Sequence, residues 1–211
     1  MRSLATTALV FGALTTLLPA AEPAVPMATH AFVDAADPAV AAVRKAGEAA
    51  IGAVGLKLTA ALTQALGNGG PEAAVEFCRT EALPLTGQPL PAHPLVTSVK
   101  RTTRRLRNPL NAPDAAEEAA LSEIERRIVL GESPLPVLVQ KVAMTADGRT
   151  EWRIYRPIMV QAGCLACHGN PAAQSAELRS RLQAHYPADQ ATGYEAGAWR
   201  GLFRATVVSA P

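Results

Sequence analysis

The sequence predicts an α+β domain built on an antiparallel sheet, and three patterns carry this prediction. Residues 39–66 repeat apolar side chains at the spacing of an amphipathic helix. Residues 137–144 and 151–158 flank the turn-forming pair Asp147-Gly148, which is typical of a β-hairpin. Residues 201–208 add a last strand, and the chain is long enough for one domain with a single core.

The long helix is expected to end at Gly67-Asn68-Gly69-Gly70, because consecutive glycines stop a helix. Its apolar side consists of Val40, Val43, Ile51, Val54, Leu58, Leu62 and Leu66. Pro71 and Glu72 then begin a second helix, since proline and acidic residues suit a first turn. This helix carries Cys78 and is expected to run to about Ala82.

The middle of the chain alternates extended and helical segments. Residues 95–107 look extended and end at Asn108-Pro109, because the residue before a proline is pushed away from the helical region. A third helix begins at Pro113-Asp114 and stops at Gly131. A last helix is expected over about 175–185.

The amino terminus has the features of a secretory signal peptide, expected over residues 1–21. Arg2 supplies a positive charge, residues 4–18 are apolar, and small residues follow for cleavage. Residues 22–38, rich in Ala and Pro, are expected to be a flexible leader before a single domain over 39–211. The mature protein is expected in the periplasm, with no transmembrane domain after signal cleavage, although retention of the segment as an anchor stays open.

The most informative motif is Cys164-Leu165-Ala166-Cys167-His168, the C-x-x-C-H pattern of covalent haem attachment. Two thiols at this spacing reach the two vinyl groups of one porphyrin, and the adjacent imidazole binds its iron. Cys164 and Cys167 would form thioethers, and His168 would be the proximal axial ligand of one haem c. The export signal agrees, because bacteria attach this haem outside the inner membrane.

Other interpretations of this spacing are less well supported. A zinc site needs about four Cys or His ligands, and the sequence has no second C-x-x-C or H-x-x-x-H. A redox dithiol normally opens a helix after a strand in a βαβ unit, whereas Gly169-Asn170-Pro171 follows this motif. A structural disulfide between Cys164 and Cys167 is the remaining alternative. A net charge of +2 gives no reason to expect nucleic acid as a partner.

The residues alone leave the second axial ligand open among Cys78, Met144, Met159, His93, His185 and no side chain. Cys78 is the odd cysteine of an exported protein, but a lone cysteine is ordinarily a small buried hydrophobe. Arg101, Arg105 and Tyr155 are candidate contacts of the haem propionates or pocket, because arginine binds carboxylates in bidentate geometry. The alternative for this basic stretch is a solvated strand face.

Four segments together resemble the bacterial single-haem "c-type heme family" domain, in its free periplasmic form. The segments are Gly70-Pro71-Glu72-Ala73-Ala74 with Glu76-Phe77-Cys78, then 106–114, then Tyr155-Arg156-Pro157-Ile158 with the haem motif, and 193–201. The resemblance covers about residues 40–208 and implies a PAS-like antiparallel sheet flanked by helices. It also implies that Cys78 is the second axial ligand opposite His168. The chain departs from the sensor-protein pattern because no kinase or chemoreceptor segment follows its last strand.

A thiolate ligand opposite an imidazole lowers the reduction potential, because its negative charge favours oxidised iron. The expected function is therefore redox or small-gas sensing by a low-potential haem, with NO or CO as a possible ligand and a redox or signalling protein as partner. The alternative is a plain periplasmic electron carrier. An enzyme is not expected, because the sequence shows no distal acid–base pair.

Overall fold

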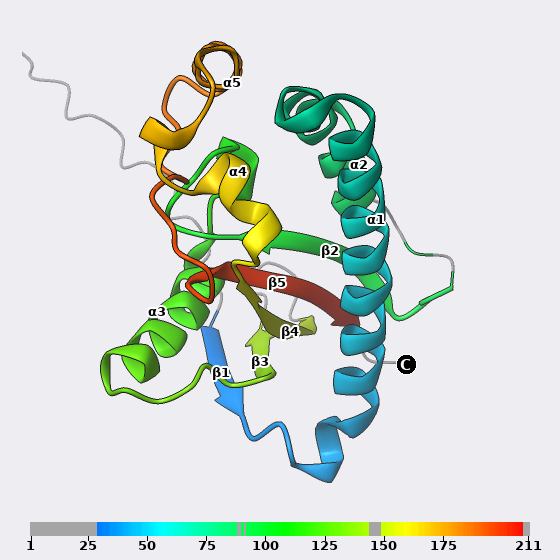
Figure 1. Cartoon of the computed structure of the whole chain (residues 1–211). Helices are drawn as coiled ribbons and strands as arrows, with labels where there is room; N and C mark the ends of the chain where they lie inside the picture. Colours follow the sequence, from blue (N-terminus) through cyan, green and yellow to red (C-terminus); the bar gives the residue numbers. More distant parts are fainter. Residues whose placement is uncertain (1–28, 88–89, 91, 144–148, 209–211) are drawn as a thin grey trace, which may run out of the picture.

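The computed structural model describes residues 29–87, 90, 92–143 and 149–208, which form a five-stranded sheet with helices on both faces (Figure 1). The strands are β1 (Thr29–Val33), β2 (Val96–Thr102), β3 (Leu138–Ala143), β4 (Thr150–Met159) and β5 (Trp199–Val208). The α-helices are α1 (Ala41–Thr80), α2 (Ala82–Gly87), α3 (Ala115–Val129), α4 (Leu165–His168) and α5 (Ala176–His185). Four 3-10 turns are η1 (Pro38–Val40), η2 (Pro109–Asn111), η3 (Ala162–Cys164) and η4 (Pro171–Ala173).

The strand order in the sheet is β1-β3-β4-β5-β2, and all neighbouring strands run antiparallel. The expected hairpin is present, because β3 pairs with β4 from Leu138↔Tyr155 to Ala143↔Thr150. The pair Asp147-Gly148 lies outside the described residues. The predicted α+β class with an antiparallel sheet flanked by helices is therefore confirmed.

The glycines that were expected to separate two helices produce a kink inside α1. Gly70 has a φ of +69°, in the left-handed region that glycine enters without a steric penalty, and Pro71 follows it. The chain then continues as a second helical segment that carries Cys78 to the end of α1. The kink thus turns the cysteine-bearing part of α1 away from the axis of its first part.

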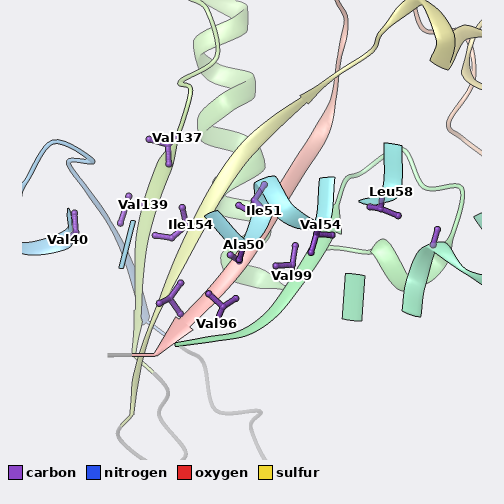
Figure 2. Packing of buried hydrophobic residues seen from close by; sticks show 13 residues of the cluster. Val40, Ala50, Ile51, Val54, Leu58, Val96, Val99, Val137, Val139 and Ile154 are labelled. Atoms are coloured by element: carbon purple, nitrogen blue, oxygen red, sulfur yellow. The ribbon is translucent and has the colours of Figure 1, made fainter. Parts of the chain in front are cut away.

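The first part of α1 packs on one face of the sheet and forms the larger core (Figure 2). Buried residues of this helix, including Ile51 and Val54, belong to one cluster with Ile154 of β4 and Ala205 of β5. The approach is closest at Gly47, where an added Cβ would lie 2.4 Å from Cγ1 of Ile154. A glycine is therefore required here by the distance between helix and sheet.

This helix also meets a criterion for a membrane span. Pro38–Thr80 is long enough, and its most apolar window has a mean hydropathy of 1.4, with 22% of that window buried in the protein. The sequence predicts no transmembrane domain after signal cleavage, yet this helix is long and apolar enough to cross a membrane by length and composition alone. The core helix of a soluble protein meets the same criterion, and the buried side of α1 packs on the sheet.

The helix α3 covers the opposite face of the sheet. Asp114 and Glu117 form a capping box at its start, and Leu121 and Ile124 pack in a cluster with Tyr155 of β4. Glu117 is fully buried, with Nζ of Lys100 at 2.7 Å and Nε of Arg204 at 2.9 Å from its carboxylate oxygens. The face under α3 is thus held by buried charges as well as by apolar contacts.

The predicted flexible leader over 22–38 is wrong for residues 29–33. These residues form the edge strand β1, which pairs antiparallel with β3 from Thr29↔Ala143 to Val33↔Val139. The pairing partner lies more than a hundred residues away, so local composition does not reveal it. The predicted signal peptide, residues 1–21, and residues 22–28 lie outside the described residues.

The strand β2 ends at Thr102, earlier than the predicted end at residue 107. The following arginines leave the sheet because they have partners elsewhere. Arg104 donates to Glu118 and Ser122 of α3, whereas Arg105 and Arg107 reach carbonyl oxygens in the loop after α5. Arg101 is therefore the last arginine of this basic stretch that lies in β2.

Candidate functional site

The C-x-x-C-H motif occupies one tight helical turn at the end of β4, made of η3 and α4. Residues three and four apart share one side of a helix, so Cys164, Cys167 and His168 project from the same turn. The turn ends at Gly169, whose amide donates to the carbonyl oxygen of Leu165 at 2.9 Å. A Cβ at Gly169 would lie 2.6 Å from that oxygen, so this position requires glycine.

His168 is held in one orientation by the loop that follows α5. Its Nδ1 lies 2.7 Å from the carbonyl oxygen of Ala191, and its own carbonyl accepts from the amide of Tyr194 at 2.9 Å. Burial, and after it the charge of Arg107, lowers the pKa of His168 to about 3. The imidazole is therefore neutral with Nδ1 as the donor, and Nε2 keeps the lone pair that a metal ion requires.

The two thiols of the motif lie in different apolar surroundings, and neither forms a disulfide. Cys164 packs against Val160 and Tyr194, whereas Cys167 packs against a cluster made by α1 and α5 that includes Val75 and Tyr186. The alternative of a structural disulfide between Cys164 and Cys167 is thus not observed. Both sulfurs are available for other bonds.

Cys78 approaches this turn from the end of α1. Burial raises the pKa of the Cys167 thiol, and a thiolate at Cys78 lies close enough to raise it further. Burial raises the pKa of Cys78 itself, and the charges of Arg101 and Arg107 oppose that rise. Figure 1 shows α4 and α5 at the same end of the sheet as the last turns of α1. The structure therefore brings the third cysteine to the motif.

Arg107 connects the motif to the loop after α5. Its guanidinium donates to the carbonyl oxygen of Cys167 at 2.6 Å and to that of Ala191 at 3.3 Å, and it pairs with Asp189 at 2.9 Å. Both members of the ion pair are 11% exposed. This arginine positions the two segments that carry and orient His168.

The candidate pocket arginines differ in their surroundings. Arg105 is exposed, donates to the carbonyl oxygens of Gln190 and Thr192, and lies over the ring of Tyr194 at 4.1 Å. Arg101, on the α1 side of β2, has a buried Nε without a hydrogen-bond partner among the described residues. Arg105 thus serves the loop, whereas Arg101 is left with unsatisfied charge beside Cys78.

Tyr155 does not lie at the motif. Its side chain is fully buried in the cluster under α3, where its hydroxyl donates to Oε1 of Gln140 at 2.7 Å. The expectation that Tyr155 contacts the haem pocket is contradicted by this position. Successive side chains of a strand point to opposite faces of the sheet. The neighbouring Ile154 faces α1, so Tyr155 faces α3.

The other candidate ligands also lie elsewhere. Nε2 of His185 is 3.8 Å from Glu76, and Met159 lines a small surface hollow with Pro134 and Pro136. Met144 lies outside the described residues. His93 is half-buried in the segment before β2. Among the described candidates, Cys78 is the one whose charge acts on a thiol of the motif.

Sequence reasoning missed Asp189, the carbonyl of Ala191, and Arg200. Arg200 donates through Nη1 to the hydroxyl of Thr103 at 2.9 Å and lies over the ring of Tyr194 at 5.3 Å. Its charge also lowers the pKa of His168, which places it at the same site. The segment 193–201 was singled out only by the family resemblance, and no local motif marks these residues.

A bare metal site is not formed by this arrangement. Among the residues that the structure describes, no three or more His, Cys, Asp or Glu side chains gather closely enough to hold a metal ion. A hollow of about 340 Å³ lies between β1, β3 and α3 and contains no residue of the motif. The chemistry of the site therefore depends on what bonds to its thiols and imidazole.

The residues present fit a haem attached through thioethers. Two free thiols lie on the turn that carries a neutral imidazole, a third thiol approaches from α1, and Arg101 offers an unpaired cation for an acidic group. Cys164 and Cys167 could bind the porphyrin edge, and His168 and Cys78 could bind its iron.

The chain is similar to a known heme-protein. The crystal structure of the cyanobacterial heme-protein Tll0287 is 24% identical in sequence, with a TM-score of 0.48, over 83% of this chain and 98% of that chain. A search of curated proteins found no match. The family described as Tll0287-like matches residues 92–208, which is more than half of the chain and spans the C-x-x-C-H motif. The chain therefore belongs to the Tll0287-like family.

Proposed function

We propose that the protein carries one covalent haem c, with thioethers at Cys164 and Cys167, and that His168 and Cys78 are the axial ligands. The observation that carries this proposal is the fixed, neutral imidazole of His168 beside two free thiols on one turn. Membership of the Tll0287-like family agrees with it, because the protein that gives the family its name is described as a heme-protein.

The proposed role is redox or small-gas sensing. The haem supplies an iron that changes oxidation state and can bind NO or CO when a coordination position is free. Burial raises the pKa of Cys78, which favours the neutral thiol, while Arg101 and Arg107 favour the thiolate. Burial is the larger effect, so the unbound side chain is favoured as the neutral thiol, which suits a ligand that can leave the iron.

Electron transfer is the second candidate, and exposure of the attachment segment favours it. Gly163 and Ala166, next to the two cysteines, are exposed, so a partner protein can approach this turn. A carrier would keep both axial ligands in both oxidation states. The protein is proposed to act by binding and electron transfer and not as an enzyme.

The proposed location is the periplasm, with residues 1–21 as the export signal. The apolar run of that segment and the haem motif support this together, because export must precede covalent attachment in bacteria. A free redox or signalling protein of that compartment is the proposed partner.

Covalent attachment is tested by producing the chain together with the cytochrome c maturation machinery. A pyridine haemochrome spectrum should show two thioether bonds, whereas the C164A variant should show one. Haem that is extracted with acidified acetone from the wild-type protein would contradict covalent attachment. Production without the machinery is the control and should leave the protein without covalently attached haem.

The sensing role is tested by the optical spectrum of the reduced holoprotein with and without CO. A sensor should change on adding CO, because Cys78 leaves the iron on reduction. A carrier should give the same spectrum with and without CO, and that result would select the second candidate.

A further inference from the structure

Three guanidinium groups gather around the turn that bears Cys167 and His168. They come from Arg101 on β2, Arg107 in the loop after it, and Arg200 at the start of β5. The charges of Arg101 and Arg107 both act on Cys78, and both lower the pKa of Arg200. The three guanidinium groups are therefore close enough for their charges to act on the same side chains.

Within the described part of the chain, only one of these three cations forms an ion pair with a carboxylate. Arg107 pairs with Asp189 at 2.9 Å. Arg200 has the hydroxyl of Thr103 and the ring of Tyr194, which are polar or aromatic but carry no charge. Burial lowers the pKa of Arg200, as expected for a cation without a counter-ion.

Arg101 is the least satisfied of the three. It projects from β2 on the side of its sheet neighbour Phe203, which packs against the α1 core. The side chain is half-buried, but its Nε is shut off from solvent and has no hydrogen-bond partner among the described residues. Leaving a buried charged donor unpaired is costly, so a partner outside the protein chain is indicated.

The acidic residues of the neighbouring helix have other partners. Glu72 accepts a hydrogen bond from Ser175 at 2.6 Å, and Glu76 pairs with Arg79 at 2.5 Å. The carboxylate of Asp189 is already bound by Arg107. Among the described residues Arg101 and Arg200 therefore form no ion pair, and Asp189, whose charge also reaches Arg200, is bound by Arg107.

We propose that Arg101 and Arg200 form an anion site that binds the two propionate carboxylates of the haem. This inference rests on the proposed function, because it assigns the protein groups that bind the acidic edge of the same cofactor. Two carboxylates match the two unpaired cations in charge, and guanidinium groups bind carboxylates through paired hydrogen bonds. Arg200 thus takes the role that the sequence suggested for Arg105 and Tyr155.

The test compares haem with its dimethyl ester, in which both propionates are neutral. Wild-type apoprotein is titrated with each ferric compound, before thioether formation, and the dissociation constants are measured by absorbance. Haem should bind the wild-type protein about tenfold or more tightly than the ester, since a charge-assisted hydrogen bond is strong. The R101Q/R200Q variant should bind both compounds equally.

Two further variants separate charge from structure. R101K/R200K keeps both charges and should recover part of the preference for haem. R104Q removes an arginine whose partners are Glu118 and Ser122 of α3, and it should keep the full wild-type preference. Circular dichroism of each apoprotein verifies that the variants fold.

The outcomes distinguish this inference from the proposed function. Equal binding of haem and ester by the wild-type protein, or an unchanged preference in folded R101Q/R200Q, would overturn the anion site and leave the haem proposal intact. Absence of haem from wild-type protein made with the maturation machinery, together with no binding of either compound, would overturn both.

Discussion

Nδ1 of His168 lies 2.7 Å from the carbonyl oxygen of Ala191, so the imidazole is fixed by a loop that follows it by more than twenty residues. A carbonyl oxygen can only accept, and this contact therefore selects the tautomer protonated at Nδ1. The same loop is tied back by the amide of Tyr194, which donates to the carbonyl of His168 at 2.9 Å. Hydrogen bonds thus join His168 to the loop after α5 through both its side chain and its backbone.

This arrangement predicts acid-sensitive stability of the apoprotein. Burial lowers the pKa of His168 from its ordinary 6.5 to about 3, so the unfolded chain takes up a proton first as the pH falls. The contribution of His168 to the free energy of unfolding is therefore fully present above about pH 6.5, and it declines as the pH falls toward 3. Between these pH values the protonation of His168 should lower the free energy of unfolding by up to about 1.4 kcal/mol per pH unit. Urea unfolding at several pH values measures it.

The H168Q variant is the matched control for this prediction. Glutamine is polar and does not titrate, so the difference in unfolding free energy between wild type and variant should shrink as the pH falls from 6.5 to 4. Parallel stability curves for the two proteins over this range would show that His168 does not carry the effect.

Replacement of Cys78 should change the oxidised haem. Cys78 is the sulfur that α1 brings to the motif, and it is close enough to influence the thiol of Cys167. In the C78S holoprotein the thiolate features of the oxidised optical and EPR spectra should disappear, and the reduction potential should rise because the anionic ligand is lost. Spectra identical to those of the wild type would exclude Cys78 as the ligand.

The motif and its helical turn could be predicted because their chemistry is local in sequence. Cys164, Cys167 and His168 are adjacent, and the glycine run at 67–70 marks the kink of α1 directly. Side chains alternate along β4, so Tyr155 lies on the face opposite to Ile154, which packs under α1, and strand periodicity is enough to predict this.

The rest of the site depends on contacts between segments far apart in sequence. Arg107 and Asp189 are separated by 82 residues, and Arg200 and Thr103 by 97. No local sequence pattern predicts such pairs, because each of these residues considered alone is typical of a solvent-exposed position. The edge strand β1 was missed for the same reason, because its partner β3 follows more than a hundred residues later.

Glu117 should be essential for stability under α3. It is fully buried between Lys100 at 2.7 Å and Arg204 at 2.9 Å. The E117Q variant leaves two cations without their shared carboxylate, and we expect a loss of about 3–5 kcal/mol in unfolding free energy. The neighbouring E118Q, which breaks an exposed pair with Arg104, should cost about 0–1 kcal/mol. Similar losses for both variants would contradict the burial argument.

Replacing either of two glycines of α1 by alanine should change the stability of the protein, in opposite directions at the two positions. At Gly47 a Cβ would lie 2.4 Å from Cγ1 of Ile154, so G47A should destabilise the protein by about 1–3 kcal/mol. At Gly52 an added Cβ has nothing within 4 Å, so G52A should stabilise the helix by up to about 1 kcal/mol. Thermal unfolding of both variants measures these changes. A G47A protein as stable as wild type would show that α1 can move away from β4.

Arg107 should control the local stability of the loop that orients His168. It donates to the carbonyl oxygens of Cys167 and Ala191 and pairs with Asp189, both members of the pair being 11% exposed. The R107Q variant leaves Asp189 buried without its cation, and we expect a loss of about 3–5 kcal/mol.

The signature of this positioning role lies in hydrogen exchange of two amides. Gly193 donates to the carbonyl of Gly169 at 2.8 Å and Tyr194 to that of His168 at 2.9 Å, so both should exchange faster in R107Q. The matched control is R181Q, which breaks an exposed pair with Glu177 on α5. Its exchange should stay at the wild-type rate, because that pair does not reach the loop. Unchanged protection of both amides in R107Q would place the control of this loop elsewhere, most directly in the contacts of Arg105 with Gln190 and Thr192.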